Sequence, residues 1–327
     1  MAPKPFWQDT FSKLGSMGLS IAIFFAVLLV IFFIAGKAKG KFQKPISIFI
    51  FLFPAVLLVS IGLVIPLIQT VFFSFKDPNS IKFVGWENYK WILTNADMHK
   101  VLINTLLWLL VTPFLTTFLG LVLAIFLDRM KRESIPKSLI FMPMAISFVG
   151  GSLIWNLMYS FQESNRPQTG LIGQLTLWLG LPVKHILLWS PWNNFFLMAV
   201  YIWGFTGFSM VILSAAIKAI PSEIEEAAQL DGATGFKLFR TVTVPMVRTT
   251  IIVVLTTAMV GTLKLFDVVH TMTGGNFKTD VLANRMVDEN FVYLNYGHGS
   301  VLAVLIFLLV IPISYYNIRS LRAERKH

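Results

Sequence analysis

Long apolar runs dominate this 327-residue chain and constrain its fold more than any motif does. A helix that crosses a membrane needs about 20 mostly apolar residues to span a hydrocarbon core of about 30 Å. Only helices and closed barrels satisfy their backbone groups in lipid, and these runs are continuous rather than alternating. We therefore predict an all-α polytopic membrane protein with about seven transmembrane helices, at 14–36, 46–73, 101–127, 138–160, 195–217, 249–270 and 299–317.

The composition excludes several other classes of protein. Apolar residues make up 56% of the chain and charged residues only 13%, whereas a soluble domain has about 25% charged residues. The chain has no cysteine, which excludes disulfides, thiol nucleophiles and zinc–thiolate sites. Its five histidines show no metal-ligand spacing, so we predict no metal site and no catalytic residues.

The net charge of +11 is explained by membrane orientation, without nucleic acid. Sixteen of the 27 Lys and Arg residues fall in the short segments 36–45, 128–137, 218–248 and 318–327. Cytoplasmic loops of membrane proteins carry such an excess of positive charge. We therefore predict that these segments are cytoplasmic, with the N-terminus outside and the C-terminus inside.

The first apolar run is predicted to be an anchor. The alternative is a cleaved signal peptide, but the run is longer than the usual 7–15 residues of such a signal. Four lysines also follow the run instead of preceding it. We assign residues 1–45 to an N-terminal anchor helix with a cytoplasmic linker, and residues 46–327 to the main transmembrane domain.

The segment 218–245, between the fifth and sixth spans, is the most informative stretch of the chain. Ser222 and Glu225 have the spacing of a capping box, which predicts the start of a short helix. Gly232 is expected to end that helix, Thr234 to begin a second one, and Pro245 to close it. Two short helices with an exposed apolar bend are typical of a docking surface for another protein. The alternative is a connector that packs on its own helix bundle.

These residues carry a family resemblance. Glu226-Ala227-Ala228 is followed after three residues by Gly232 and after nine more by Val242-Thr243-Val244-Pro245. This resembles the EAA loop of type I ABC importer permeases, which has Ile and Leu where this chain has Val242 and Val244. Both replacements are conservative, and every spacing is met.

A second match lies further along the chain. Phe266-Asp267 and Thr273-Gly274-Gly275 resemble a stretch of the carbohydrate branch of these permeases, which includes MalF-like and α-glucoside permeases. The family often has Pro after the glycines, whereas this chain has Asn276-Phe277. That variation, together with 281–286, is similar to α-glucoside-type permeases, and Asn104-Thr105 also fits. The resemblance covers about residues 45–325.

The resemblance implies a transport subunit and not an enzyme. Such a permease forms a heterodimer with a second permease in the bacterial or archaeal inner membrane. Two ATPase subunits bind ATP and Mg, and an extracytoplasmic solute-binding protein delivers the sugar. This chain has no phosphate-binding G-x-x-x-x-G-K-[ST] loop, so the partner ATPases must hydrolyse the ATP. ATP binding would drive alternating access through the EAA loop.

The resemblance also implies two groups of site residues. Contact with the ATPase is expected from Glu223, Glu226, Ala227, Ala228, Asp231, Gly232 and Pro245. The substrate path is expected along the two helices that flank the EAA loop, at Tyr201, Trp203, Phe205, Phe208, Ala258, Thr262, Lys264 and Leu265. Aromatic rings suit the apolar faces of sugars.

Two alternatives within the path remain open at this point. The aromatic residues from Tyr201 to Phe208 have the spacing of an ordinary packing stripe. Lys264 and Asp267 are three residues apart in a predicted span, which favours an intramembrane ion pair. Such a pair would not need to touch substrate.

Two alternatives for the function are also open. One is an ABC permease for another solute, such as glycerol phosphate or an osmolyte like glucosylglycerol. The other is an ion-coupled secondary transporter, which would need acidic or broken-helix ion sites near the bilayer midplane. Asp267 is the only clear intramembrane acid and lies near one end of a span. The sequence does not identify the sugar or the partner subunits.

Overall fold

A computed structural model describes residues 6–37, 43–163 and 166–324. Every regular element in these ranges is a helix, and the only β-type pairing there is an isolated bridge between Lys76 and Phe83. This confirms the all-α prediction. The chain divides into two compact units, residues 1–69 and 70–327, which are described separately. The predicted domain boundary at residue 45 stays a prediction.

The first unit consists of two apolar helical segments. Helix α1 (Phe6–Lys37) covers the first predicted span. Helix α2 (Gln43–Val59) continues through a π-helical turn (Ser60–Val64) into α3 (Ile65–Phe73), which ends in the second unit. The described apolar side chains of this unit are mostly exposed, among them Leu58 at 71% and Leu63 at 67%. Exposed apolar side chains on all faces of a helix are typical of a segment solvated by lipid.

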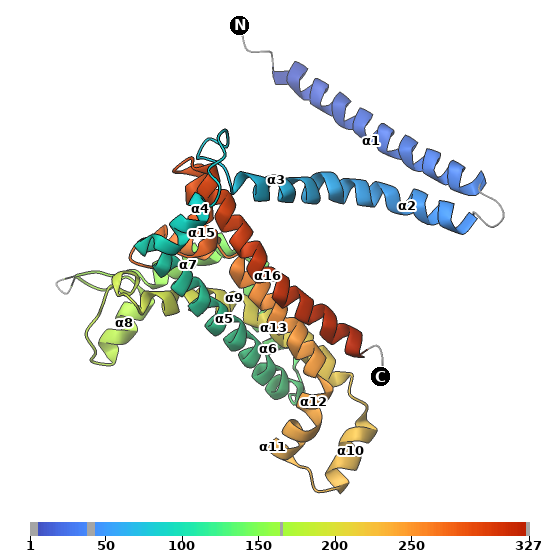
Figure 1. Ribbon diagram of the computed structural model, residues 1–327. Coiled ribbons are helices and arrows are strands. Elements are labelled where there is room, and N and C mark those ends of the chain that lie inside the picture. The colour runs from blue at the N-terminus through green and yellow to red at the C-terminus, as the bar shows by residue number, and fades with distance from the viewer. Residues whose placement is uncertain (1–5, 38–42, 164–165, 325–327) are drawn as a thin grey trace. The chain divides into compact units, whose positions relative to one another are not determined.

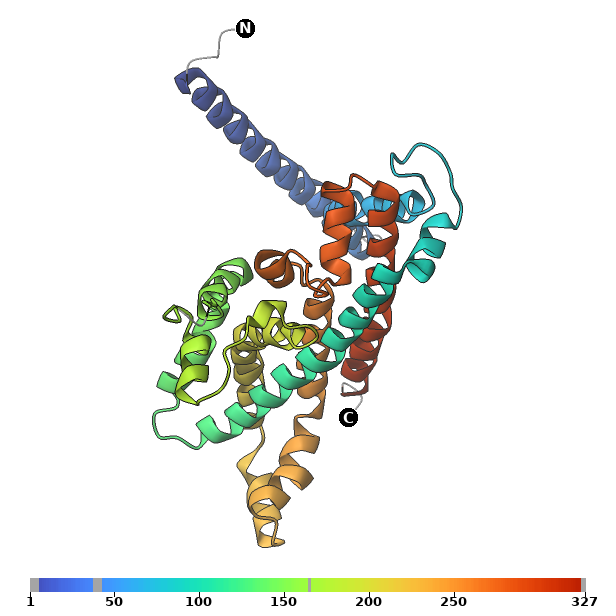
Figure 2. The same cartoon turned by 90° about the vertical axis from the view of Figure 1, so that its left-hand side faces the viewer.

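The second unit is a helix bundle built on three long helices (Figures 1 and 2). These are α5 (Ala96–Asp128), α9 (Asn193–Lys218) and α16 (Tyr296–Glu324). Across the described residues, four helices are long and apolar enough to cross a membrane, or up to six if each of two bent pairs counts as one span. The predicted count of seven is therefore not confirmed.

The predicted span 138–160 is broken and not straight. Helix α6 (Ser134–Phe141) passes through a 3-10 turn (Met142–Ala145) into α7 (Phe148–Met158), and the two halves are bent by 102°. Pro143 occupies the 3-10 turn, and the Ser147 side chain caps α7 by accepting from the Gly150 amide at 3.1 Å. A proline and a new N-cap are sufficient local causes for the break.

The predicted span 249–270 is also interrupted. Helix α13 (Arg248–Leu263) ends before Lys264, and the short helix α14 (Asp267–Thr273) begins three residues later. Lys264 and Asp267 therefore do not share a helical turn, which corrects the prediction. Among the residues that the structure describes, no ion pair joins them.

The core of the bundle lies where α5 packs against α9. A β-carbon added to Gly120 of α5 would lie 2.5 Å from the β-carbon of Ser209 in α9. The two helices are therefore too close at this point for any residue larger than glycine at position 120. The Trp108 indole is 2% exposed and donates to the Asn194 side chain at 3.2 Å. Such close packing makes α5 and α9 one rigid pair.

Short helices cover the two ends of the bundle. One end carries α4 (Glu87–Thr94), α8 (Leu171–Trp178), α14 and α15 (Leu282–Phe291). The other end carries α10 (Ser222–Leu230), α11 (Gly235–Leu238), a π-helical turn (Phe239–Thr243) and α12 (Val244–Met246). The second group projects away from the long helices in both views (Figures 1 and 2).

Candidate functional site

The projecting segment 221–247, which we call the elbow, is made of two short helical arms with a tight turn between them. Helix α10 ends at Leu230 with Asp231 as its C-cap, and Gly232 follows with a φ of +79°. A left-handed backbone of this kind favours glycine because it has no β-carbon. Thr234 then precedes α11, as predicted. The predicted two-helix elbow is therefore present.

Two local details of the elbow differ from the prediction. The capping box is absent, because Pro221 is the N-cap and Ser222 is already inside α10, with no side-chain cap at that end. Pro245 does not close the second arm either, since it lies at the start of α12, which runs to Met246. The chain turns by 71° at Val247 and enters α13. The elbow thus connects directly to α9 at one end and to α13 at the other.

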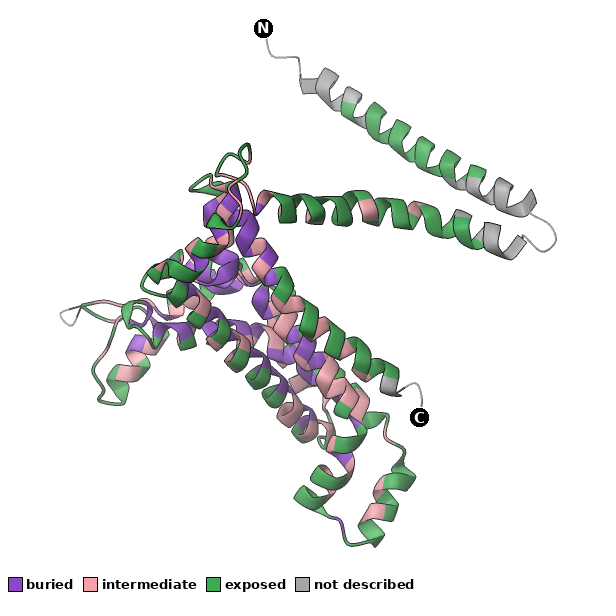
Figure 3. Ribbon diagram, viewed as in Figure 1, coloured by how far each residue is buried: buried purple, intermediate pink, exposed green. Residues whose placement is uncertain are grey.

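The elbow is largely exposed (Figure 3). Of the seven residues expected to contact an ATPase, Ala228 is half-buried and the others are exposed: Glu223, Glu226, Ala227, Asp231, Gly232 and Pro245. Leu230 is 89% exposed and Phe236 is 74% exposed. No residue of α10 is buried, so this arm does not pack on the bundle as a plain connector would. Sequence reasoning missed Leu230, although an apolar residue just before an Asp-Gly turn is a usable signal.

The opposite end of the bundle holds a strained loop, 274–281, which begins with the two glycines of the matched Thr-Gly-Gly stretch. Gly274 and Gly275 have φ values of +60° and +75°, and the non-glycine residues Phe277 and Lys278 have +56° and +64°. Left-handed backbone at bulky residues is costly and persists only where surrounding contacts impose it. The loop must therefore be anchored from outside.

Three asparagine amides supply that anchor. Asn104 of α5 donates to the carbonyl oxygens of Lys278 and Asp280, both at 2.9 Å. Asn193 donates to the Phe277 carbonyl at 2.9 Å, and Asn194 donates to the Lys278 carbonyl at 3.2 Å. The structure thus joins two separately matched stretches, Asn104-Thr105 and the Thr-Gly-Gly region. Asn193 and Asn194 were not singled out from sequence, because no local pattern shows what an amide will bind.

The loop also carries the half-buried carboxyl group of Asp280. Asp280 accepts hydrogen bonds from the Val281 amide at 2.9 Å and from the Asn284 side chain at 2.7 Å. Burial raises the pKa of the Asp280 carboxyl to about 6, although the Asn284 hydrogen bond and the nearby Arg285 charge act in the opposite direction. The carboxyl group supports the loop and is partly protonated in mildly acidic conditions.

Some of the residues expected along the substrate path line a cavity of about 300 Å³ between the bent pair α6–α7 and α9. Trp203 and Phe205 lie on its wall, opposite Ser147 and Phe148. Tyr201 is not on the wall: it is 1% exposed and stacks between Phe148 and Phe205, with ring centroids 5.1 and 5.5 Å away. Phe208 is not on the wall either, and its ring centroid lies 5.1 Å from that of Phe205. Of the four aromatic residues, Trp203 and Phe205 therefore line the cavity, whereas Tyr201 and Phe208 pack against neighbouring rings.

The four path residues on the second flanking helix lie elsewhere. Ala258, Thr262 and Leu265 are buried in the bundle, and Lys264 is exposed at the end of α13. The Thr262 hydroxyl donates to the Ala258 carbonyl at 2.9 Å, as is common for threonine in apolar helices. None of the four belongs to the wall of the 300 Å³ cavity. Within the part of the chain that the structure describes, no three His, Asp or Glu residues form a metal-binding cluster.

Several known proteins are similar to this chain in sequence or in fold. Residues 18–325 match the family described as "binding-protein-dependent transport system inner membrane component". The osmoprotective compounds uptake permease protein GgtC of Synechocystis is 44% identical over 84% of this chain and 98% of its own length. The α-glucoside transport system permease protein AglF of Rhizobium meliloti is 42% identical over 88% of this chain and 89% of its own. A bacterial ABC transporter that imports the acidic polysaccharide alginate has a chain of the same fold, with a TM-score of 0.73 and 20% identity over 85% of this chain and 97% of that one.

These matches cover nearly the whole chain, including the elbow and the anchored loop, and they exclude the secondary-transporter alternative. The chain belongs to the family of binding-protein-dependent transport system inner membrane components, and it is a permease subunit of an ABC importer rather than an enzyme.

Proposed function

We propose that the elbow is the docking element for an ATPase subunit. This chain would pair with a second permease, and each permease would bind one ATPase that carries the ATP and Mg. A solute-binding protein would deliver substrate to the opposite end. The observation that carries the proposal is the exposure of Leu230 and Phe236 on arms that project from the bundle. Large apolar side chains exposed in this way favour insertion into a cleft on a partner protein.

The connection of the elbow to two helices suggests how coupling works. One arm continues from α9 and the other continues into α13, so a displacement of the elbow reaches both helices. ATP binding would close the ATPase pair and shift the bundle between inward- and outward-facing states. ATP can shift this equilibrium only through tighter binding to one of the two states.

The proposed substrate is a neutral di- or oligosaccharide or a related α-glucoside. The wall of the 300 Å³ cavity presents the rings of Trp203 and Phe205 beside the hydroxyl of Ser147. Aromatic faces stack on the apolar faces of sugar rings, and hydroxyls provide donors and acceptors. The likeness to an α-glucoside permease supports the same class of substrate.

A second candidate is an osmoprotective solute such as glucosylglycerol. It is favoured by the 44% identity to a permease for osmoprotective compounds. A glycerol phosphate is a weaker candidate, because the residues that line the cavity carry no positive charge.

We also propose that the elbow end faces the cytoplasm, with the N-terminus outside and the C-terminus inside. The clustering of 16 of the 27 Lys and Arg residues in 36–45, 128–137, 218–248 and 318–327 supports this orientation. The end of α16 lies toward the elbow end of the bundle, in agreement with a cytoplasmic C-terminus (Figure 1). Residues 1–45 would act as an anchor and linker outside the main transmembrane domain.

Co-purification with the partner subunits tests the docking proposal. The chain is co-expressed with its partner permease and ATPase and extracted in mild detergent, as wild type, Leu230→Asp and Leu179→Asp. Leu179 is 74% exposed at the opposite end of the bundle and serves as the control. We expect Leu230→Asp to recover roughly tenfold less ATPase, as for a docking residue at the centre of an interface, and Leu179→Asp to behave as wild type. Equal recovery in all three would contradict the proposal.

Import into liposomes then identifies the solute. Maltose, trehalose and glucosylglycerol are each supplied with the solute-binding protein. Uptake of a disaccharide supports the sugar proposal, and uptake of glucosylglycerol alone supports the osmolyte alternative. Import that continues without ATP but requires an ion gradient would contradict both.

A further inference from the structure

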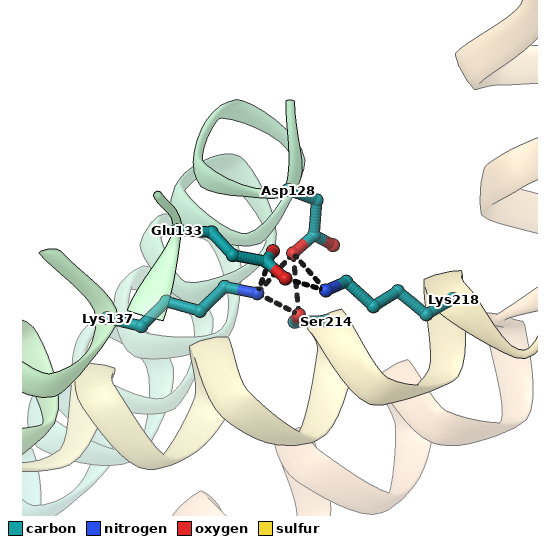
Figure 4. A network of polar contacts seen from close by, with 5 residues as sticks. All are labelled: Asp128, Glu133, Lys137, Ser214 and Lys218. Atoms are coloured by element: carbon teal, nitrogen blue, oxygen red, sulfur yellow. Dashed lines mark hydrogen bonds and ion pairs between the residues drawn. The ribbon is translucent and has the colours of Figure 1, made fainter. Parts of the chain in front are cut away.

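Five polar side chains form a closed cluster at the root of the elbow (Figure 4). Asp128 is the last residue of α5, Glu133 and Lys137 lie at the start of α6, and Ser214 and Lys218 lie in the last turns of α9. Two carboxylates and two ammonium groups balance one another. This charge cluster therefore joins α5 and α6, which are neighbours along the chain, to α9, whose contributing residues lie 77 to 86 positions further on.

The Lys137 ammonium group is the centre of the cluster. It donates to Asp128, to Glu133 Oε2 at 2.8 Å and to Ser214 Oγ at 2.8 Å. The Ser214 hydroxyl donates in turn to Asp128 Oδ1 at 2.7 Å. The Lys218 ammonium group donates to Glu133 and lies 4.0 Å from Asp128 Oδ1. Every charged member thus contacts at least two others.

The cluster is more protected than an ordinary surface ion pair. The Asp128 and Lys137 side chains are only 11% and 15% exposed. The hydrogen bonds from Lys137 and then Lys218 lower the pKa of the Glu133 carboxyl to about 2, so this group stays ionised at any physiological pH. Partly buried networks of this kind hold their members in one geometry, whereas isolated surface pairs contribute little.

The position of the cluster connects it to the elbow. Lys218 is the last residue of α9, and only three residues separate it from α10. A cavity of about 180 Å³ lies at the same place, with Asp128 on one wall and Glu225, Gly235 and Phe239 of the elbow on the others. The cluster therefore lies at the end of the closely packed α5–α9 pair from which the elbow emerges.

Close backbone packing extends this joint toward α6. A β-carbon on Gly207 of α9 would lie 2.5 Å from the Ile140 carbonyl oxygen, so α6 and α9 are in direct contact one to two turns above the cluster. With Gly120 against Ser209, α9 packs closely against both α5 and α6 near this end. The charge cluster ties Lys218, the last residue of α9 and the residue from which the elbow emerges, to the end of α5 and the start of α6.

We propose that the charge cluster is the joint that transmits elbow displacement to α5, α6 and α9. Glu133 and Lys218 are positioning residues: they fix the direction in which the chain leaves α9 and do not themselves contact the ATPase. This inference rests on the proposed function of the elbow. It predicts that a broken cluster raises the amount of ATP hydrolysed per imported solute, while the ATPase stays bound to the permease.

A charge exchange across the cluster tests the joint. The assembled importer, with its ATPases, second permease and binding protein, is reconstituted as wild type, Glu133→Lys, Lys218→Glu and the double variant. The measured quantity is ATP hydrolysed per solute imported. We expect each single variant to raise this ratio on the order of fivefold, and the double variant to return it to within about twofold of wild type. A role in stability alone would change the melting temperature but not the ratio.

The exposed pair Asp97–Lys100 at the other end of α5 provides the matched control, with side chains 76% and 52% exposed. Lys100→Glu is expected to leave the ratio unchanged. If Lys218→Glu does not accumulate, Lys218→Gln removes the charge without reversing it, and the same rise is expected. The ATPase could co-purify with every Lys218 and Glu133 variant while each variant hydrolyses as much ATP per imported solute as wild type. That result would contradict the proposed joint and leave the elbow proposal intact. Failure of the wild-type chain to recover an ATPase overturns the elbow proposal instead.

Discussion

Asn104 and Lys278, 174 positions apart in the chain, are joined by a hydrogen bond of 2.9 Å from the Asn104 amide to the Lys278 carbonyl. The acceptor residue has a left-handed backbone, with a φ of +64°, that an L-amino acid rarely adopts without outside support. Asn104 is 9% exposed, so water does not readily replace it. The end of α5 thereby fixes the loop that the solute-binding protein is proposed to face.

Removal of this amide should loosen the loop. Asn104→Ala leaves the Asp280 carbonyl without its donor and the Lys278 carbonyl with only Asn194, which costs about 1–3 kcal/mol of folding free energy. Thermal unfolding of the purified chain in detergent measures the loss. Asn79→Ala, at an exposed position, is the control and should not change the melting temperature. Equal melting temperatures for both variants would show that the amide does not anchor the loop.

The turn of the elbow should depend on the backbone of Gly232. Gly232→Ala adds a β-carbon that meets no atom within 4 Å, so its effect is backbone strain of about 1–2 kcal/mol at a φ of +79°. We expect reduced ATPase stimulation by the binding protein. Gly180→Ala imposes similar strain in a loop at the opposite end, with a φ of +67° and also no atom within 4 Å. If both variants reduce stimulation equally, the effect is not specific to the elbow.

The half-buried carboxyl of Asp280 should make stability depend on pH. Its pKa is about 6 in the folded chain against an ordinary value of 3.8, so the neutral form favours folding. That contribution is fully present below about pH 4 and is lost as the pH rises through 6, for a total on the order of 2–3 kcal/mol. Wild type should therefore lose stability between pH 4 and pH 7 relative to Asp280→Asn, which keeps the acceptor oxygen. Melting temperatures across this range test the difference, and Asp97→Asn, an exposed control, should follow the wild-type curve.

The wall of the 300 Å³ cavity should affect solute affinity. Trp203→Ala removes a ring from this wall, whereas Phe208→Ala removes a ring of the same helix that is not on the wall and packs against Phe205. Loss of an aromatic contact worth about 1 kcal/mol raises the KM for import roughly fivefold. Trp203→Phe should retain most of the affinity. If Phe208→Ala raises KM as much as Trp203→Ala, the cavity is not the binding site.

The helices of the elbow could be predicted because their signals are local. The Asp231-Gly232 turn and the position of Thr234 depend on backbone preferences of a few residues, and the structure has both. The prediction of a capping box is wrong, because Pro221 occupies the N-cap position and Ser222 lies inside the helix. Which of two adjacent residues caps a helix is decided by how the chain enters it, and that is a tertiary property.

The breaks at 142–147 and 264–266 could not be predicted from apolar runs. Hydropathy over 20 residues is nearly unchanged by a bend, because the side chains on both sides of it remain apolar. The second break separates Lys264 from Asp267, so the helical spacing that predicted an ion pair did not apply. The roles of Asn193 and Asn194, and the links of the charge cluster to α9, could not be predicted for a related reason: these partners are 77 or more residues away in the chain.

The sequence by itself determined that this chain is an all-helical membrane protein with an exposed elbow and a permease motif. Long apolar runs exclude water-soluble folds. The permease motif can be recognised because its residues and spacings lie in one contiguous loop. Only the tertiary structure decided which aromatic residues line a cavity, which amides hold the strained loop and which charges meet at the root of the elbow. Each of these depends on the distance between helices that are far apart in sequence, and side-chain contacts act over only a few ångströms.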